Sequence, residues 1–223
     1  MTDTEHPTPR GLSGLDRWLS RIDRRMGQLA NPRKAAGQKV RPSPATGHAE
    51  PKLSPGERAH AAGLMRVNHT GEVCAQALYQ GQALIARSEA TREELLTAAQ
   101  EEADHLAWCE ARLTELDAEP SKLNPLFYAA SFAIGAITAA VGDKVSLGFV
   151  HATEERVANH LRSHLKSLPG EDRKSQLILQ QMLSDEERHG DNALAQGGQE
   201  FPRPVKDAMT LASKVMTRTT YWI

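Results

Sequence analysis

Residues 101–106 read EEADHL, and residues 185–190 read DEERHG. Each stretch places a glutamate three positions before a histidine, and residues at this spacing lie on one face of a helix. One such pair arises often by chance on a charged helix, so its meaning depends on the face that carries it. The two pairs are Glu102 with His105 and Glu186 with His189.

Apolar residues surround both pairs at the three- and four-residue spacing of a helix face that points into a core. This register selects Glu102 rather than its neighbour Glu101. In the second stretch it selects Glu186 rather than Glu187. The apolar positions are Leu95, Ala98, Ala99, Leu106, Cys109, Leu113 and Leu116 around the first pair, and Leu179, Met182 and Ala193 around the second.

Two more glutamates lie in apolar stripes of their own. Glu72 precedes the first pair's glutamate by 30 residues, and Glu154 precedes the second pair's glutamate by 32. The two halves of the chain therefore offer the same set, which is one glutamate followed by a Glu-x-x-His pair. We expect four helices, each of which places a glutamate in its core-facing stripe.

Burying four carboxylates costs several kcal/mol per ion unless they are neutralised. Few lysines or arginines lie on these stripes, whereas two divalent metal ions would neutralise all four groups. Four carboxylates and two imidazoles are the ligand set of di-iron and di-manganese bundles. A metal-free bundle with chance ionisable groups is disfavoured by the same cost. The predicted ligands are Glu72, Glu102, His105, Glu154, Glu186 and His189, and we predict no catalytic residue beyond them.

Caps and breakers divide the chain into helices. Ser54, Pro55 and Glu57 form a helix start, and Thr91 with Glu94 resembles a second capping box. No strand-like alternation of useful length appears. We therefore predict an all-α four-helix bundle. The expected helices cover about residues 55–87, 91–117, 143–168 and 171–196, followed by a terminal helix over 205–219.

The chain is predicted to have two parts. Residues 1–53 form a flexible basic leader, with a short amphipathic helix at 14–29 and a linker after it, and residues 54–223 form the di-iron domain. Residues 1–50 carry nine Lys/Arg against five Asp/Glu. Such a leader can bind an anionic lipid surface or nucleic acid, or can be a solvated arm. The net charge of −1 argues against a whole-molecule polyanion binder.

The compartment is read from the cysteines and the N-terminus. Cys74 and Cys109 are the two cysteines, which are too few for a disulfide framework, so a reducing, intracellular compartment is the simpler interpretation. Hard carboxylate sites do not need thiolate ligands. The N-terminus lacks the apolar segment of a secretory signal.

Residues 123–142 contain no formal charge and read LNPLFYAASFAIGAITAAVG. The segment is long enough to cross a membrane, yet it is rich in alanine and glycine. Three structures remain open: a membrane span, an extra apolar crossover helix packed across the bundle, and an interfacial helix that dips into lipid.

Other polar residues near the stripes are candidates to orient the metal-ligating histidines. Among the histidines, His151 is the most plausible, because it lies three residues before Glu154. Asp104 and Asp185 can accept the second N–H of a ligand histidine or can lie on a solvated face. The remaining candidates are His69, His160 and His164, for which a solvent-facing or satisfied role is more common.

Several stretches resemble the Coq7-type demethoxyubiquinone hydroxylases, and the resemblance covers about residues 55–223. The stretches are MRVNHTGE (65–72), EEADHL (101–106), LNPL..A.SFAIGA (123–136), GDKVSLGFV..TEE (142–155), DEERHGD (185–191) and SKVMTRTTYWI (213–223). The family's ligand pattern falls on the six residues already found, and favours Glu154 over Glu155.

The resemblance implies a ferritin-like bundle that binds two iron ions. It also implies hydroxylation of a polyprenyl methoxy-methyl benzoquinol (demethoxyubiquinol) in ubiquinone biosynthesis, with O2 and reducing equivalents from NADH. The family is attached peripherally to a membrane. A short leader fits a bacterial member on the cytoplasmic face of the inner membrane, with other ubiquinone-biosynthesis proteins as partners and no nucleic acid.

Three other functions stay open from the residues alone. A ferritin-like iron store would take up many irons per chain. A di-iron oxygenase acting on fatty acyl groups or tRNA would share the ligands but lack the quinone-family stretches. A non-enzymatic membrane-binding bundle would carry no metal.

Overall fold

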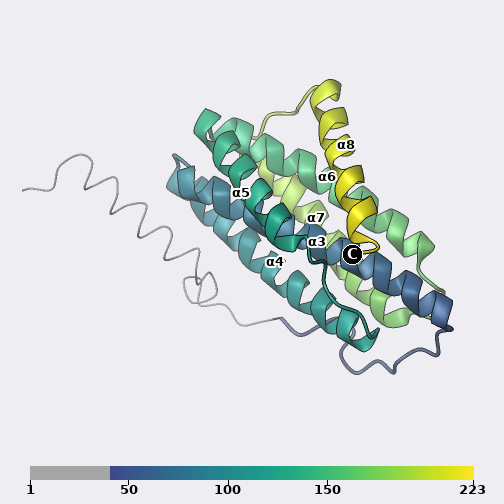
Figure 1. Cartoon of the computed structure of the whole chain (residues 1–223). Coiled ribbons are helices and arrows are strands. Elements are labelled where there is room, and N and C mark those ends of the chain that lie inside the picture. The colour runs from purple at the N-terminus through teal and green to yellow at the C-terminus, as the bar shows by residue number, and fades with distance from the viewer. Residues whose placement is uncertain (1–40) are drawn as a thin grey trace, which may run out of the picture.

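The structure is a computed structural model that describes residues 41–223. The predicted helix at 14–29 lies outside the described residues. Within the described part every regular element is a helix, which confirms the all-α prediction (Figure 1). The helices are α3 (Pro55–Ile85), α4 (Glu89–Glu115), α5 (Asn124–Val141), α6 (Asp143–Ser167), α7 (Arg173–Ala195) and α8 (Arg203–Thr220).

Helices α3, α4, α6 and α7 form the bundle. α3 packs against α4 and α6 packs against α7, while α5 lies along α3 and also contacts α6 (Figure 1). α8 crosses the outside of the bundle, where it contacts α3 and α6. This is the ferritin-like four-helix bundle with an extra crossover helix and a terminal helix.

The helix starts follow local capping chemistry. Ser54 Oγ accepts a hydrogen bond from Glu57 N at 3.3 Å, and Ser54 N donates to Glu57 Oε2 at 2.9 Å, so the first predicted capping box is confirmed. The second box was wrong. α4 begins at Glu89, because Ser88 Oγ accepts a hydrogen bond from Thr91 N at 3.4 Å. Ser88 therefore caps the helix three residues before the predicted cap, Thr91.

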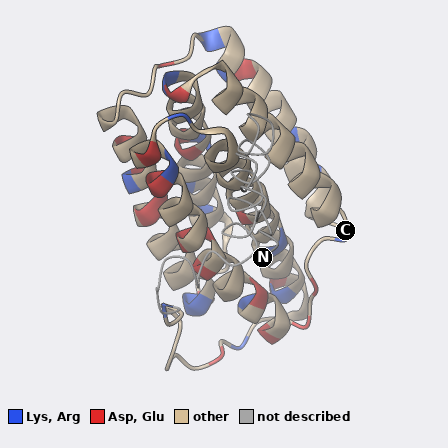
Figure 2. Ribbon diagram, turned by 90° about the vertical axis from the view of Figure 1, so that its left-hand side faces the viewer, with Lys and Arg blue, Asp and Glu red and all other residues tan. Residues whose placement is uncertain are grey.

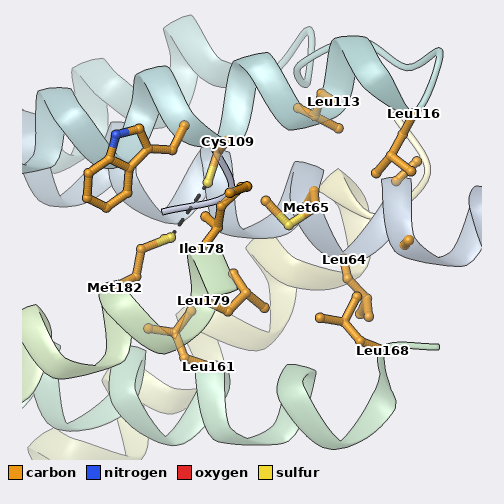
Figure 3. Packing of buried hydrophobic residues seen from close by; sticks show 14 residues of the cluster. Leu64, Met65, Cys109, Leu113, Leu116, Leu161, Leu168, Ile178, Leu179 and Met182 are labelled. Carbon is orange, nitrogen blue, oxygen red and sulfur yellow. Dashed lines mark hydrogen bonds between the residues drawn. The ribbon is translucent and has the colours of Figure 1, made fainter. Parts of the chain in front are cut away.

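Two apolar clusters fill the bundle core, one on each side of the predicted ligands. Along α4, Leu95 belongs to one cluster and Leu113 to the other, with the predicted ligands between them. Figure 3 shows the second of these clusters, in which Cys109 and Met182 face each other with their sulfur atoms 3.8 Å apart. The predicted ligands therefore lie in the middle of the bundle, with apolar packing above and below.

Close backbone packing joins α5 to α3. A Cβ at Gly81 would lie 2.2 Å from Phe132 O, and a Cβ at Gly135 would lie 2.2 Å from Leu78 O. Glycine at both positions lets the two backbones approach. α5 is thus packed on the bundle along one side, and its exposed outer residues include Leu126, Ile134, Ile137 and Val141.

By length and composition, Asn124–Val141 is long and apolar enough to cross a membrane. A single helix that meets these two criteria is weak evidence for a membrane span. Elsewhere, basic and acidic residues are mixed along the same helices (Figure 2). The described part of the predicted linker, Arg41–Leu53, runs along α4 and α7 with Ala45 buried, and we call it the N-terminal strap.

Candidate metal centre

All six predicted ligands are buried in the bundle, and the structure brings them together. Within the described chain, two groups have ligand atoms that lie within 4.8 Å of one another. Glu102 and Glu186 belong to both groups. The groups are Glu72, Glu102, His105 and Glu186, and Glu102, Glu154, Glu186 and His189.

The shared glutamates point one oxygen toward each histidine. Glu102 Oε2 lies 3.0 Å from His105 Nδ1, and Glu102 Oε1 lies 3.4 Å from His189 Nδ1. Glu186 repeats this pattern, with Oε1 3.3 Å from His105 Nδ1 and Oε2 3.4 Å from His189 Nδ1. A carboxylate that divides its oxygens in this way can bridge two metal ions.

The other two glutamates each belong to one side. Glu72 Oε2 lies 3.3 Å from His105 Nδ1, and Glu154 groups with His189. The site therefore consists of two equivalent halves, each with one terminal glutamate and one histidine, joined by two shared carboxylates. This is the division expected of a four-carboxylate, two-histidine dinuclear centre.

Unsatisfied polar atoms test whether the site suits a metal. Both carboxylate oxygens of Glu154 and the Nδ1 atom of His189 are buried without a hydrogen-bond partner among the described residues. An unmade bond of this kind costs about 1–3 kcal/mol, and more for a charged group. Oxygen and imidazole donors suit iron or manganese. The residues present thus fit a pair of such ions.

The protein's own charges show how the site is balanced without metal. Burial raises the pKa values of Glu72 and Glu154 well above the usual range, and neighbouring glutamates raise them further. Burial also opposes charge on Glu102, but the facing His105 lowers the pKa of Glu102 to about 2. The pKa of His105 is raised despite burial, by the charge of Glu102. The raised pKa values favour the protonated forms of Glu72, Glu154 and His105, and these protons reduce the negative charge that metal cations would otherwise neutralise.

Each histidine uses its outer nitrogen to reach an acid on the opposite helix. His105 Nε2 donates to Asp185 Oδ2 at 3.0 Å, and His189 Nε2 donates to Glu101 Oε2 at 2.6 Å. Such contacts fix the tautomer and the orientation of a ligating imidazole. The Nδ1 atoms are thereby left to face the shared carboxylates.

Sequence reasoning found part of this outer layer. Asp185 accepts the second N–H of a ligand histidine, which is one of the two roles predicted for it. Asp104 instead pairs with Arg41. Glu101 was missed. Its signal was the first acid of EEADH, which directly precedes Glu102 just as Asp185 directly precedes Glu186 in DEERH.

His151, the histidine predicted to orient a ligand, contacts the backbone of α7 instead. His151 Nδ1 donates to Gly190 O at 3.1 Å. His164 Nδ1 pairs with Asn68 Oδ1 at 2.9 Å, and His69 Nδ1 lies 3.2 Å from Asn124 Nδ2.

A family model described as ubiquinone biosynthesis protein COQ7 matches residues 59–220. The chain belongs to the COQ7 family. It is 56% identical over 214 residues to the 3-demethoxyubiquinol 3-hydroxylase of Azotobacter vinelandii, covering 96% of this chain and 98% of that protein. It is 54% identical over 216 residues to the protein of the same name from Pseudomonas fluorescens, covering 97% and 99%.

This membership confirms the family resemblance and makes the chain an enzyme. All six predicted ligands, together with Glu101 and Asp185, lie inside the span that the COQ7 family model matches. The N-terminal strap lies outside it, although the full-length relatives align over nearly the whole chain.

Proposed function

We propose that this COQ7-family chain is a di-iron monooxygenase that hydroxylates demethoxyubiquinol in ubiquinone biosynthesis. The observation that carries the proposal is the pair of buried carboxylates, Glu102 and Glu186, that each face both ligand histidines. The names of the relatives supply the substrate.

The chain's residues hold and isolate the centre. Glu102 and Glu186 belong to both ligand groups and would be shared by the two ions. Glu72 with His105 would complete one position, and Glu154 with His189 would complete the other. Two bound iron ions would supply the redox chemistry that activates O2 for transfer of one oxygen atom to the electron-rich quinol ring.

Water is excluded by the apolar clusters on either side of the ligands, which include Leu95 and Tyr79 on one side and Trp108 and Leu113 on the other. A dry site strengthens the electrostatic contacts within it. No separate acid or base is assigned to the protein. O2 is the co-substrate and NADH the source of electrons.

Membrane attachment follows from the substrate and from the outer surface. A polyprenyl tail partitions into lipid, so the enzyme must meet the membrane to take it up. α5 exposes an apolar face, and α8 exposes Leu211 and Val215 next to the chain end with Trp222 and Ile223. Three exposed basic residues of α8, Arg203, Lys214 and Arg218, suit an anionic leaflet, whereas Lys206 pairs with Glu155.

We therefore place the enzyme peripherally on the cytoplasmic face of a bacterial inner membrane, with other ubiquinone-biosynthesis proteins as partners. The packing of α5 against α3 favours interfacial contact over a free span, because a span surrounded by lipid would not have one side against a bundle.

The function is tested by iron and quinone analysis together. Glu102→Ala and His189→Ala should lose bound iron and demethoxyubiquinol hydroxylation together, and a strain lacking the gene should accumulate demethoxyubiquinone. The wild-type chain should bind two irons. Full activity in a verified iron-free variant would overturn the proposal, and uptake of many irons per chain would indicate an iron store.

Membrane attachment is tested by flotation with phosphatidylethanolamine and phosphatidylglycerol vesicles. Ile137→Glu and Leu211→Glu should each reduce the vesicle-bound fraction several-fold, while Thr97→Glu on the exposed side of α4 serves as the matched control. Equal binding by all three variants would exclude these faces as the contact surface.

A further inference from the structure

The N-terminal strap is tied to the bundle at both ends. At one end, Arg41 reaches the acids near the metal centre. At the other end, Glu50 Oε2 accepts from Arg112 Nη1 at 2.8 Å and lies 3.1 Å from Lys174 Nζ. The strap thus runs from the start of α7 to the middle of the bundle, across the side formed by α4 and α7.

Arg41 occupies a position directly behind a ligand histidine. Its Nε donates to Asp104 Oδ2 at 3.1 Å, and its Nη1 donates to Asp185 Oδ2 at 2.9 Å. The guanidinium also stacks over the Trp108 ring at 4.9 Å, and Trp108 Nε1 donates to Arg41 O at 3.1 Å. Its Nη2 lies 3.4 Å from His105 Nε2.

One oxygen atom links Arg41 to the predicted ligand. Asp185 Oδ2 accepts from Arg41 Nη1 and from His105 Nε2, so the arginine fixes the atom that orients the imidazole. Asp185 is only 4% exposed, so removing Arg41 would leave the buried Asp185 carboxylate with less compensation for its charge, which destabilises it. Gln181 and Arg188 also contact Asp185, but through Oδ1.

The other half of the centre is built differently. His189 Nε2 donates to Glu101, and Glu101 forms an ion pair with Arg188, which lies on the same helix as His189. The side chain of Arg188 is 46% exposed, whereas that of Arg41 is 34% exposed and lies on an aromatic ring. The strap therefore covers one histidine and leaves the other half to residues of the bundle alone.

We propose that Arg41 is a positioning residue for one of the two metal positions, the one that contains His105. It acts through Asp185, and this inference rests on the proposed dinuclear function. The consequence is that the two positions, equivalent in their ligands, differ in affinity, because the strap stabilises the orientation of one imidazole.

Metal binding at separate positions tests the proposal. His189→Ala leaves the His105 position, and His105→Ala leaves the other. Adding Arg41→Met, which keeps an unbranched side chain but removes the guanidinium, should weaken Mn²⁺ binding in the His189→Ala protein about tenfold, the lower end for a partner behind a ligand. In the His105→Ala protein it should change nothing. Arg41→Lys should restore part of the affinity.

A measurement on the metal-free protein removes the dependence on metal binding. The Nε2–H signal of His105 in ¹⁵N NMR should exchange slowly in the wild type and quickly in Arg41→Met, while the His189 signal stays unchanged. Glu50→Gln loosens the other end of the strap without touching Asp185, and should leave both signals unchanged.

The outcomes separate this inference from the proposed function. Failure of the wild-type chain to bind two ions would refute the function, whatever the Arg41 variants do. Two bound ions with equal loss at both positions in Arg41→Met, or an unchanged His105 signal, would refute the positioning role while the function stands.

Discussion

Glu101 on α4 accepts a hydrogen bond from His189 on α7 at 2.6 Å. The reverse contact runs from His105 on α4 to Asp185 on α7 at 3.0 Å. Each acid directly precedes the glutamate of its own helix that both ligand groups share. Each helix therefore supplies a shared carboxylate and also the acid that orients the histidine of the other helix. The two helices are thereby locked in register around the centre.

This exchange predicts that Glu101 controls the His189 position. Glu101→Ala should weaken metal binding at that position about 10–100-fold, because the imidazole loses its orienting acceptor. Equilibrium dialysis of the His105→Ala protein against Mn²⁺, with and without Glu101→Ala, measures the effect. Glu93→Ala, an exposed glutamate of the same helix, is the control. Equal affinities with and without Glu101 would contradict the role.

The buried carboxylates predict opposite effects on stability and binding. Burial, followed by the charge of Glu186, raises the pKa of Glu154. A carboxyl group with a raised pKa in the folded state destabilises the protein above its unfolded pKa of about 4.5, increasingly as pH rises. At pH 7 we expect Glu154→Gln to stabilise the metal-free protein, and the gain should grow as pH rises above 4.5.

The same variant should bind metal less tightly, since an amide replaces a charged ligand. Thermal unfolding with and without Mn²⁺ measures both effects. A metal-free Glu154→Gln protein less stable than the wild type would show that the carboxylate is not a net cost in the fold.

Helix contact between α3 and α5 predicts intolerance of a methyl group. Gly135→Ala would place Cβ 2.2 Å from Leu78 O, which is backbone and cannot move aside. We expect a loss of about 1–3 kcal/mol or more in the free energy of unfolding, measured by urea denaturation. Gly170→Ala has no atom within 4 Å of its Cβ and should be nearly neutral. Equal effects of the two substitutions would argue against the close approach.

Acid sensitivity is predicted at a histidine away from the metal ligands. Burial, with the neighbouring His160 and His60, lowers the pKa of His164 to about 3. A group with a depressed pKa is neutral in the folded state and charged in the unfolded state as pH falls below 6.5, so stability is lost over the range from 6.5 toward 3.

The loss for this one proton is at most about 1.4 kcal/mol per pH unit. His164→Gln can keep a hydrogen bond to Asn68, and should flatten the decline in the free energy of unfolding between pH 6.5 and pH 5. The exposed His48→Gln is the control. A decline as steep in His164→Gln as in the wild type would assign the acid sensitivity to other groups.

Local rules account for the helices and for most of their ends. Ser54 with Glu57 marked the first start correctly, because a capping box is made of residues three apart in the chain. The same rule failed at Thr91, since Ser88 offered a hydroxyl at an equally suitable position three residues earlier. Helix propensity cannot choose between two candidate caps that lie three residues apart.

The sequence by itself determined which acids and histidines face the core. Helical periodicity and the cost of a buried charge act along each helix separately, so they identified Glu72, Glu102, Glu154 and Glu186 before any helix was placed. Only the tertiary structure decided that Glu102 and Glu186 are shared, that Glu101 meets His189, and that Arg41 covers one position. These contacts join helices and a strap far apart in the chain, and depend on crossing and register that no local pattern contains.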